Sequence, residues 1–592
     1  MAVEKLIVDH IDTWTTALQT RSTAGRGSSG KIDLYGIKKL RELILELAVR
    51  GKLVPQDPND EPASELLKRI AAEKAEQVKQ GKIKKPKPLP EISEEEKPFE
   101  LPAGWEWTTL NTLAEINPKI DVSDDEQDIS FVPMPLISTK FDGSHDFEVR
   151  KWKEVKKGYT HFANGDIAIA KITPCFENSK AAIFSGLKNN VGVGTTELHV
   201  ARPYSQVVNQ QYLLLNFKSP SFLKTGESQM TGSAGQKRVP RNFVENYPLP
   251  FPPLQEQERI VNKFTQLMIL CDQLEQHSLS SLDAHQQLVE TLLTTLTDSQ
   301  NADELAENWA RISEHFDTLF TTEASIDSLK QTILQLAVMG KLVPQDPNDS
   351  SAEILLEQLS TSRNKKLRQQ QADNKEAETM LRKINKLKKA KPPFRLPNNW
   401  TTVHLIELCE YLVDCHNKTA PYTNIGIPII RTTNIRERNF LEQDLKFISQ
   451  ETYDFWSKRC PPSPGDIIFT REAPMGEALI IPPNVKWCLG QRTMLIRVMH
   501  EYVSNEFLLL ALTEPHLLER ASENAVGLTV KHLRVGDVEN LNIPLPPLNE
   551  QYRIVDKVNN LFEYCNKLKS KIKVSQQTQL HLADALTDAA IN

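Results

Sequence analysis

Apolar residues recur at helical spacing in the same place in each half of the chain. The positions are Leu40, Leu43, Ile44 and Leu47 in the first half, and Leu329, Ile333 and Leu336 in the second. Steps of three and four residues predict an amphipathic helix. A glycine follows each stretch, and the Pro-Gln-Asp-Pro-Asn-Asp that comes next cannot continue a helix. Each half is therefore expected to begin with a helix that ends at Gly51 or Gly340.

A longer apolar seam follows a Pro-Pro pair in each half. The seam residues are Ile260, Phe264, Leu267, Cys271 and Leu274 in the first half, and Ile554, Val558, Leu561, Cys565, Leu568 and Ile572 in the second. Steps that alternate between four and three residues are typical of a coiled coil. A helix of about 40 residues would be on the order of 60 Å long. Two such helices, paired antiparallel, would form a rigid spacer between domains.

Between these helical regions, short β-branched runs alternate with glycine, proline and asparagine. Examples are the segments 165–169 and 465–469, which both begin with Gly-Asp-Ile. This pattern predicts a compact mixed α/β domain with several short strands in each half.

Three sequence motifs occur twice and frame these α/β segments. Residues 47–60 and 336–349 match at 13 of 14 positions, and residues 250–263 and 544–557 match at 10 of 14. Phe-x-Leu-Pro-x-x-Trp, ending at Trp105 or Trp400, makes the third pair. The framed segments are almost equal in length but do not resemble each other. Repeated motifs that flank two segments of unlike sequence suit a protein that recognises two different ligands or sites at a fixed separation.

The predicted fold class is α+β, with two mixed α/β domains separated by long antiparallel coiled-coil helices in a pseudo-two-fold tandem repeat. The predicted segments are an N-terminal helical region and Lys-rich arm (1–98), a first α/β domain (99–250), a central helical spacer (251–342), a second Lys-rich arm (343–393), a second α/β domain (394–547) and a C-terminal coiled-coil helix (548–592).

Composition narrows the class of protein. The chain has 592 residues, a formal net charge of −6, 39% hydrophobic and 25% charged residues. No apolar run is long enough for a membrane span and no signal peptide is evident, so we expect a cytoplasmic protein. Seven scattered cysteines without a CxxC spacing predict reduced thiols and no zinc site. Because the net charge is negative, any nucleic-acid contact must use local basic patches.

The doubled Leu-Pro-x-x-Trp and Pro-Leu/Phe-Pro-Pro-Leu-x-Glu-Gln-x-Arg-Ile-Val motifs, around two unlike domains, resemble the specificity subunits of type I restriction-modification enzymes. The resemblance covers nearly the whole chain, and the 47–60 and 336–349 blocks resemble a subgroup with larger subunits. It implies a non-catalytic subunit whose two target recognition domains each read half of an interrupted DNA site.

The resemblance also implies partners. These are double-stranded DNA, two modification subunits that methylate adenine with S-adenosylmethionine, and restriction subunits that use ATP and magnesium. No cofactor or metal is expected on this chain itself. Consistent with this, the nearest approach to an adenine methyltransferase turn is Lys-Pro-Pro-Phe at 391–394, where lysine replaces the required Asn or Asp.

Alternative functions explain less of this pattern or differ in their partners. A specificity subunit of a modification-only system differs in its partners alone. A non-catalytic coiled-coil scaffold explains the helices but not two framed domains of matching length. A self-sufficient methyltransferase or nuclease lacks the motifs it would need.

DNA contacts are predicted just before each closing motif, where glycines and basic residues occur together. The candidates are Lys237, Arg238 and Arg241 in the first domain and Lys531, His532 and Arg534 in the second. Glycine lets the backbone approach phosphates, and lysine and arginine contact phosphates or guanine edges. Further candidates near strand ends are Lys140, Lys171, Arg431, Arg436 and Arg471. The alternative is that these are solubilising surface charges.

The near-identical blocks suit a surface that must be the same twice. We therefore predict that Lys52, Gln56, Lys341 and Gln345 present equivalent docking surfaces to two identical modification subunits. The alternative is that each block only ends a helix, which both halves need in order to fold, and this explains the near-identity equally well. The Lys-rich arms are expected to be solvated linkers or helices, or else to help hold DNA or a partner.

Overall fold

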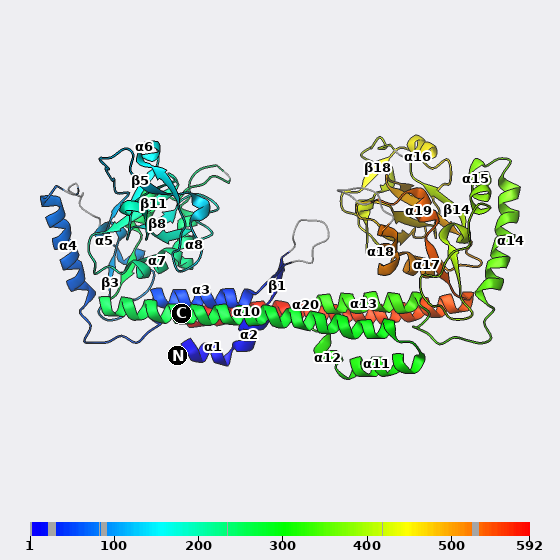
Figure 1. Ribbon diagram of the computed structural model, residues 1–592, viewed down its shortest axis with the longest axis horizontal. Helices are drawn as coiled ribbons and strands as arrows, with labels where there is room; N and C mark the ends of the chain where they lie inside the picture. The colour runs from blue at the N-terminus through cyan, green and yellow to red at the C-terminus, as the bar shows by residue number, and fades with distance from the viewer. Residues whose placement is uncertain are drawn as a thin grey trace. The chain divides into compact units, whose positions relative to one another are not determined.

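The chain forms two compact units (Figure 1), described by a computed structural model that covers residues 3–21, 31–81, 83, 92–233, 235–416, 418–523 and 532–591. The first unit consists of Met1–Ser281 and Ser575–Asn592, and the second of Leu282–Val574. The long helix α10 (Leu254–Asp298) begins in the first unit and ends in the second. The long helix α20 (Leu548–Ile591) begins in the second and ends in the first.

Helices of the first unit follow the apolar pattern of the sequence. Besides the parts of α10 and α20, they are α1 (Val3–Asp9), α2 (Ile11–Thr16), α3 (Tyr35–Val49), α4 (Ala63–Lys79), α5 (Leu110–Leu113), α6 (Trp152–Val155), α7 (Gln210–Lys218), α8 (Pro220–Ser228) and α9 (Arg241–Asn246). The predicted apolar positions of α3 are buried. Gly51, just beyond α3, has a φ of 68°, where a side chain is strained. The predicted helix and its glycine stop are confirmed.

The first α/β domain, residues 105–251, contains two four-stranded sheets. Their orders are β6-β5-β10-β7 and β4-β11-β8-β9. The strands are β4 (Ala114–Ile116), β5 (Asp128–Val132), β6 (Glu148–Lys151), β7 (Thr160–Ala163), β8 (Ile167–Ala170), β9 (Ala181–Ile183), β10 (Val191–Gly194) and β11 (Leu198–Pro203). Among these pairs β5 and β10 are parallel and the others antiparallel. Strands β3 (Glu106–Thr108) and β12 (Leu249–Phe251) pair to close the domain. A separate hairpin, β1 (Gln19–Arg21) with β2 (Lys31–Asp33), precedes α3.

In the first unit, α3 binds both long helices. Arg41 forms ion pairs with Asp272 and Glu275 of α10 at 2.5 and 2.6 Å. The hydroxyl of Tyr35 donates to Asp584 of α20 at 2.7 Å. The apolar seam of α10 from Ile260 to Cys271 is buried in this unit, as a packed helix bundle requires.

Helices of the second unit repeat the plan of the first. They are α11 (Ala302–Glu314), α12 (Phe316–Leu319), α13 (Glu323–Val338), α14 (Ala352–Gln370), α15 (Lys375–Ile384), α16 (Gln450–Trp456), α17 (Asn505–Leu512), α18 (Pro515–Glu523) and α19 (Val535–Glu539). Helix α13 corresponds to α3, and Gly340 beyond it has a φ of 70°. In this unit α13 shares one hydrophobic core with Val289 and Leu293 of α10 and with Ile554 and Val558 of α20. The seam predicted for α20 is therefore core, as expected.

The second α/β domain, residues 400–545, has an equivalent four-stranded sheet and an equivalent closing pair, but its other sheet has three strands instead of four and it contains an additional two-stranded pair. Its orders are β14-β22-β19-β20 and β18-β15-β21, with the pairs β16-β17 and β13-β23. The strands are β13 (Thr401–His404), β14 (Cys409–Asp414), β15 (Ile427–Ile430), β16 (Ile435–Arg436), β17 (Asn439–Phe440), β18 (Lys446–Ile448), β19 (Ile467–Thr470), β20 (Ala478–Ile480), β21 (Cys488–Leu489), β22 (Thr493–Val498) and β23 (Asn542–Leu545). Strand β19 takes the place of β8, and β22 the place of β11. The predicted α+β class with two framed α/β domains is confirmed.

The second Lys-rich arm is helical and belongs to the second α/β domain. Leu359 and Leu367 of α14 and Met380 of α15 are fully buried in the core of that domain. Arg363 is 1% exposed and donates to the Glu407 carbonyl oxygen. This arm is thus packed structure instead of a solvated linker. Lys82, Lys84, Lys85 and Lys87 of the first arm lie outside the described residues.

Candidate nucleic-acid interface

The duplicated motifs meet at the start of each long helix. In the first unit, Trp105 Nε1 donates to Glu256 Oε2 at 2.9 Å, and Gln56 Nε2 donates to Glu256 Oε1 at 3.1 Å. Arg259 forms an ion pair with Asp60, with Nη2 2.6 Å from Oδ2. These five residues come from all three repeated motifs, so the motifs form one structure, which we call the first clamp.

The second unit contains the equivalent second clamp. Gln345 Nε2 donates to Glu550 Oε1 at 2.7 Å, and Arg553 Nη2 lies 2.6 Å from Asp349 Oδ2. Burial raises the pKa of Glu550, as it raises the pKa of Glu256, and hydrogen bonds from the neighbouring glutamine oppose the rise. The two clamps therefore share the glutamine–glutamate and arginine–aspartate contacts, but the indole N–H of Trp105 bonds to its glutamate whereas that of Trp400 has no hydrogen-bond partner among the described residues.

The glutamine of the closing motif attaches each α/β domain to its long helix. Gln257 Oε1 accepts from the backbone N–H of Asn209 at 2.8 Å, and Gln551 Oε1 accepts from that of Ser504 at the same distance. Asn209 and Ser504 cap the N-termini of α7 and α17. The Glu-Gln-x-Arg sequence thus fixes the angle at which each domain leaves its helix, which explains why it occurs twice.

The predicted docking residues all have partners inside their own unit. Lys52 Nζ donates to the Ile591 carbonyl at the end of α20 at 2.7 Å. Lys341 Nζ donates to the Thr297 carbonyl near the end of α10 at 2.5 Å. Lysine at a helix C-terminus is favourable because the last carbonyls carry partial negative charge. In the first unit Gln56 contacts the start of α10 while Lys52 contacts the end of α20, and in the second unit Gln345 contacts the start of α20 while Lys341 contacts the end of α10. Because the start of one long helix lies beside the end of the other, the two helices run antiparallel in each unit.

In the first α/β domain, most of the predicted basic residues lie together. The backbone N–H of Val239 donates to the Lys171 carbonyl at 2.8 Å, and that of Thr173 donates to the Lys237 carbonyl at 2.9 Å. Lys171 N–H donates to the Glu197 carbonyl at 2.9 Å. The end of β8, the start of β11 and the loop before α9 therefore meet at one place. We call Lys171, Ile172, Glu197 and Arg238 the first junction.

An arginine–glutamate pair occupies the first junction. Arg238 Nε lies 2.9 Å from Glu197 Oε2, and Arg238 Nη2 lies 2.9 Å from Glu197 Oε1. The hydrogen bond from Arg238 is the largest cause that lowers the pKa of Glu197. The side chain of Arg238 is 44% exposed and that of Glu197 23%. Arg241, at the start of α9, pairs with Glu245 on its own helix.

A buried histidine supports this junction. His199 Nε2 lies 3.2 Å from the Val239 carbonyl, and His199 Nδ1 has no hydrogen-bond partner. Burial, with smaller contributions from the charges of Lys171 and Arg241, lowers the pKa of His199 to about 4. The imidazole is therefore neutral at physiological pH, and it holds the loop without adding charge.

The second α/β domain has an equivalent junction with different side chains. Arg471 N–H donates to the Arg492 carbonyl at 2.9 Å, and Leu533 N–H donates to the Arg471 carbonyl at 3.1 Å. Glu472 and His532 form an isolated β-bridge, as Ile172 and Arg238 do in the first domain. We call Arg471, Glu472, Arg492 and His532 the second junction. Arg492 Nη1 lies 3.0 Å from Glu472 Oε1.

Of the other candidates in the second domain, Arg534 lies beside the second junction and is exposed at the start of α19. Lys531 lies outside the described residues. Arg431 Nη2 donates to Asp444 Oδ2 at 2.8 Å, and Arg436 Nη1 donates to the Thr432 carbonyl at 2.7 Å. Both of these arginines therefore donate to acceptors within the chain.

Lys140 belongs to a different part of the first domain. It lies on an exposed loop next to Phe141, whose carbonyl accepts from Gln211 of α7. The structure thus brings Lys171, Lys237, Arg238 and Arg241 together and leaves Lys140 apart from them.

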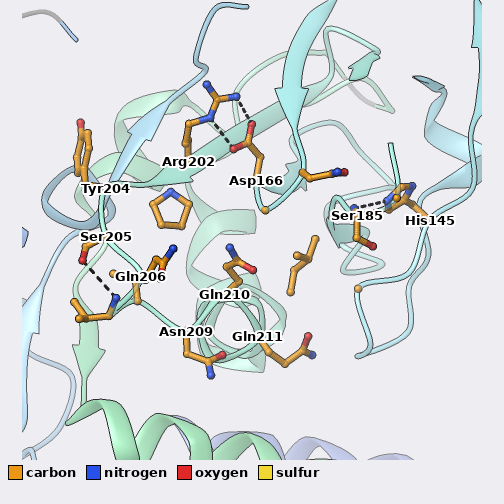
Figure 2. A pocket seen from close by; sticks show the side chains of 18 of the residues that line it. His145, Asp166, Ser185, Arg202, Tyr204, Ser205, Gln206, Asn209, Gln210 and Gln211 are labelled. Carbon is orange, nitrogen blue, oxygen red and sulfur yellow. Dashed lines mark hydrogen bonds and ion pairs between the residues drawn. The ribbon is translucent and has the colours of Figure 1, made fainter. Parts of the chain in front are cut away.

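A cavity of about 1660 Å³ lies elsewhere in the first domain (Figure 2). Asp166 and Arg202 line one side of it, with Arg202 Nη2 2.7 Å from Asp166 Oδ2. Asp466 and Arg497 form the same pair at 2.7 Å in the second domain. Because this pair recurs in both domains, we attribute it to the fold instead of to a ligand of the cavity.

Within the described ranges, no group of three or more His, Cys, Asp or Glu side chains is arranged to hold a metal ion. No helix in the described part of the chain is long and apolar enough to cross a membrane.

Sequence reasoning missed Glu197, Glu472, Arg492 and His199. One signal was available: the Gly-Asp-Ile of β8 and that of β19 align, and each is followed after a similar interval by the strand that begins at Leu198 or Thr493. An alignment of the two halves on these strands places Glu197 and Arg492 at the same position of the repeat.

Comparison with known proteins agrees with the repeated architecture. The family model described as the type I restriction modification DNA specificity domain matches residues 102–284 and 397–575. The specificity subunit of the type I restriction enzyme EcoAI of Escherichia coli is 64% identical over 100% of both chains, and that of EcoEI of the same species is 57% identical over 100% of both. The crystal structure of the HsdS subunit from Thermoanaerobacter tengcongensis aligns with a TM-score of 0.41 and 18% identity, covering 84% of this chain and 98% of that one.

The family model thus matches twice, once over each α/β domain and the first part of the long helix that follows it, and full-length relatives share more than half of the residues. The chain belongs to the family of type I restriction modification DNA specificity subunits.

Proposed function

We propose that this chain is the DNA-reading subunit of a type I restriction-modification complex that works in the cytoplasm. Each α/β domain acts as a target recognition domain for one half of an interrupted site. The observation that carries the proposal is the pair of equivalent junctions: the backbone is the same, but the polar side chains differ, as two readers of different sequences require.

The partners in this proposal are double-stranded DNA, two modification subunits and the restriction subunits. Methylation of adenine with S-adenosylmethionine, and translocation and cleavage with ATP and magnesium, belong to those partners. The curated relatives are named specificity subunits, which supports a non-catalytic role for this chain.

In the complex with DNA, the basic side chains at the junctions have two kinds of use. Lys171, Lys237, Arg241, Arg471 and Arg534 supply positive charge for phosphates, which positions the duplex without reading it. Arginine at the junction reads base edges in the major groove, where each wrong base pair costs about 1–3 kcal/mol. Lys140, Lys531, His532, Arg431 and Arg436 remain further candidates for DNA contact.

Methylation mapping tests this function. The chain is co-expressed with the modification subunit encoded beside it, and methylated adenines are located across the host DNA by sequencing. We expect one bipartite motif with an unread spacer and adenine methylation on both sides. A purified, stable complex that produces no motif would contradict the proposed function.

The predicted docking surfaces are also part of the proposal. Lys52 and Gln56 line a cavity of about 1030 Å³ in the first unit, and Lys341 and Gln345 line one of about 740 Å³ in the second. The two cavities share the Gly-Lys and Gln residues of the repeated block and the end of a long helix, which suits two identical modification subunits, although the rest of their linings differs.

The double variant Lys52→Met/Lys341→Met separates docking from folding. Each lysine also caps a helix end, so we expect about 0.3–1 kcal/mol of lost stability per site. Loss of the modification subunits on gel filtration, with an unchanged circular dichroism spectrum, would support docking. A misfolded variant, or one that assembles normally, would contradict it and favour a purely structural role of the blocks.

A further inference from the structure

Each junction contains one arginine–glutamate pair, but the two pairs occupy different positions of the same backbone. In the first junction the glutamate, Glu197, precedes β11 and the arginine, Arg238, lies on the loop before α9. In the second, the arginine, Arg492, precedes β22 and the glutamate, Glu472, follows β19. The pair is therefore present twice although no residue of it is repeated, which ordinary duplication of the sequence does not produce.

The arginine of each pair is the accessible partner. The side chains of Arg238 and Arg492 are 44% and 56% exposed, whereas those of Glu197 and Glu472 are 23% and 20% exposed. A ligand that approaches a junction thus meets the guanidinium first and finds the carboxylate behind it. All three guanidinium nitrogens of Arg238 make contacts within the chain, because Nη1 also donates to the Gln236 carbonyl at 3.1 Å.

We propose that Glu197 and Glu472 are specificity gates, which keep Arg238 and Arg492 from binding DNA phosphates and release them to a guanine base. This inference rests on the proposed DNA-reading function and names residues that carry it out. Each gate reads one G·C pair in its half-site: the arginine donates to O6 and N7 of guanine, and the released carboxylate accepts from N4 of the paired cytosine.

The electrostatics of the pair favour this use. A phosphate that approaches the arginine also approaches the carboxylate, and like charges repel. A guanine edge has acceptors for the arginine and no net charge, and its cytosine partner offers a donor to the carboxylate. The glutamate therefore weakens sequence-independent contacts more than it weakens the contact with a G·C pair. Because exposed ion pairs contribute little to folding stability, the pair opens readily, and variants that remove it should fold.

The gate predicts what a charge-neutral replacement does. Glu197→Gln keeps the size of the side chain but removes the charge that repels phosphate. We expect the affinity for DNA without the motif to rise about three- to tenfold, and the plot of log affinity against log salt to become steeper by about 0.9, because Arg238 now binds one phosphate. Methylation mapping should show a single G·C position relaxed in one half-site. Glu472→Gln should do the same in the other half-site only.

The experiment uses the purified complex of the full chain with its modification subunit. Binding is measured at several salt concentrations to a duplex that carries the mapped motif and to one of the same composition with the motif scrambled. The matched control is Glu148→Gln, which removes the partner of Arg150, 2.7 Å away, on the other sheet of the first domain. The variant Arg238→Lys keeps the positive charge but loses the two parallel donors of the guanidinium. It should therefore reduce discrimination at the same base pair as Glu197→Gln.

The outcomes separate the gate from the proposed function. A wild-type complex that binds both duplexes equally contradicts the proposed function itself. A wild-type complex that discriminates, with Glu197→Gln and Glu148→Gln indistinguishable from each other, overturns the gate alone. Relaxation at an A·T pair, or in both half-sites from one substitution, also overturns it.

Discussion

The two α/β domains are built on the same backbone plan but differ where they are proposed to meet DNA. Away from the junctions, Asp166 with Arg202 and Asp466 with Arg497 make the same ion pair at the same distance. At the junctions, Glu197 stands where the second domain has Arg492. The comparison thus distinguishes two groups of residues. The repeated residues hold each domain on its helix, and the unrepeated residues give each domain different polar side chains.

The clamps show the other side of this comparison. Gln56 and Gln345 bind equivalent glutamates, and Asp60 and Asp349 bind equivalent arginines. Equivalent glutamine–glutamate and arginine–aspartate contacts in the two units are what a complex requires if both domains must be attached to their helices in the same way. A change in a clamp should therefore affect both units alike, whereas a change at a junction should affect one.

The largest expected effect comes from the clamp glycines. A Cβ atom at Gly51 would lie 2.5 Å from Pro102 Cγ, and one at Gly340 would lie 2.5 Å from Pro397 Cγ. Left-handed backbone costs about 1–2 kcal/mol and overpacking about 1–3 kcal/mol, so Gly51→Ala and Gly340→Ala should each lose about 2–5 kcal/mol. Urea unfolding measures this loss, which we expect to be equal at the two sites.

The control for these glycines is Gly158→Ala. Gly158 also has a positive φ, 82°, but a Cβ there would meet nothing within 4 Å. It should lose only the conformational part, about 1–2 kcal/mol. If Gly51→Ala and Gly158→Ala cost the same, the close packing of the clamp does not constrain the glycine.

A second, smaller effect is expected only in the first domain. His199 has a pKa of about 4 in the folded protein, below its ordinary value of 6.5, while Met494 takes its place in the second domain. As the pH falls through 6.5 the unfolded chain binds a proton that the folded chain does not, so stability is lost between pH 6.5 and 4. The shift corresponds to about 3 kcal/mol at the lower limit.

The variant His199→Met tests this difference between the domains. Between pH 7 and pH 4.5, the wild-type first domain should lose more unfolding free energy than the variant, because Lys171 and Arg241 also disfavour a charged imidazole. Both proteins are unfolded with urea at the two pH values. An equal pH response in the two proteins would show that His199 does not titrate in this way.

The smallest expected effect is on DNA binding by single arginines. Arg238→Ala and Arg492→Ala should each lower affinity for the motif by about 1–3 kcal/mol, because each removes a bidentate base contact. Titration of the motif duplex measures the loss, and substitution of bases in one half-site at a time locates it. Loss of discrimination in the same half-site for both variants would contradict the assignment of one domain to each half.

Much of the fold could be predicted from the sequence because it depends on local patterns. The helix that ends at Gly51, the seam from Ile260 to Cys271 and the paired α/β domains follow from spacing, turn residues and repetition. Basic residues near glycine also indicated Arg238, and a predicted strand end indicated Lys171. These features are visible in short windows of the chain.

The remaining features depend on contacts between distant residues. Lys52 bonds to Ile591 across 539 positions, and nothing near Lys52 in the sequence indicates that contact. Glu197 lies 41 positions from Arg238, and as a single acid before a strand it resembles any surface carboxylate. The packing of Arg363 inside the second α/β domain was hidden because lysines surround it in the sequence, which is typical of solvated helices.

We propose above all that each α/β domain reads its own half-site independently of the other domain. The most direct test of this proposal is to replace residues 99–250 with the corresponding segment of the 57% identical relative and to map adenine methylation by the chimaeric complex. The account predicts that one half of the motif changes, while the other half and the spacer length stay the same. A chimaera that assembles normally and changes both halves would contradict it.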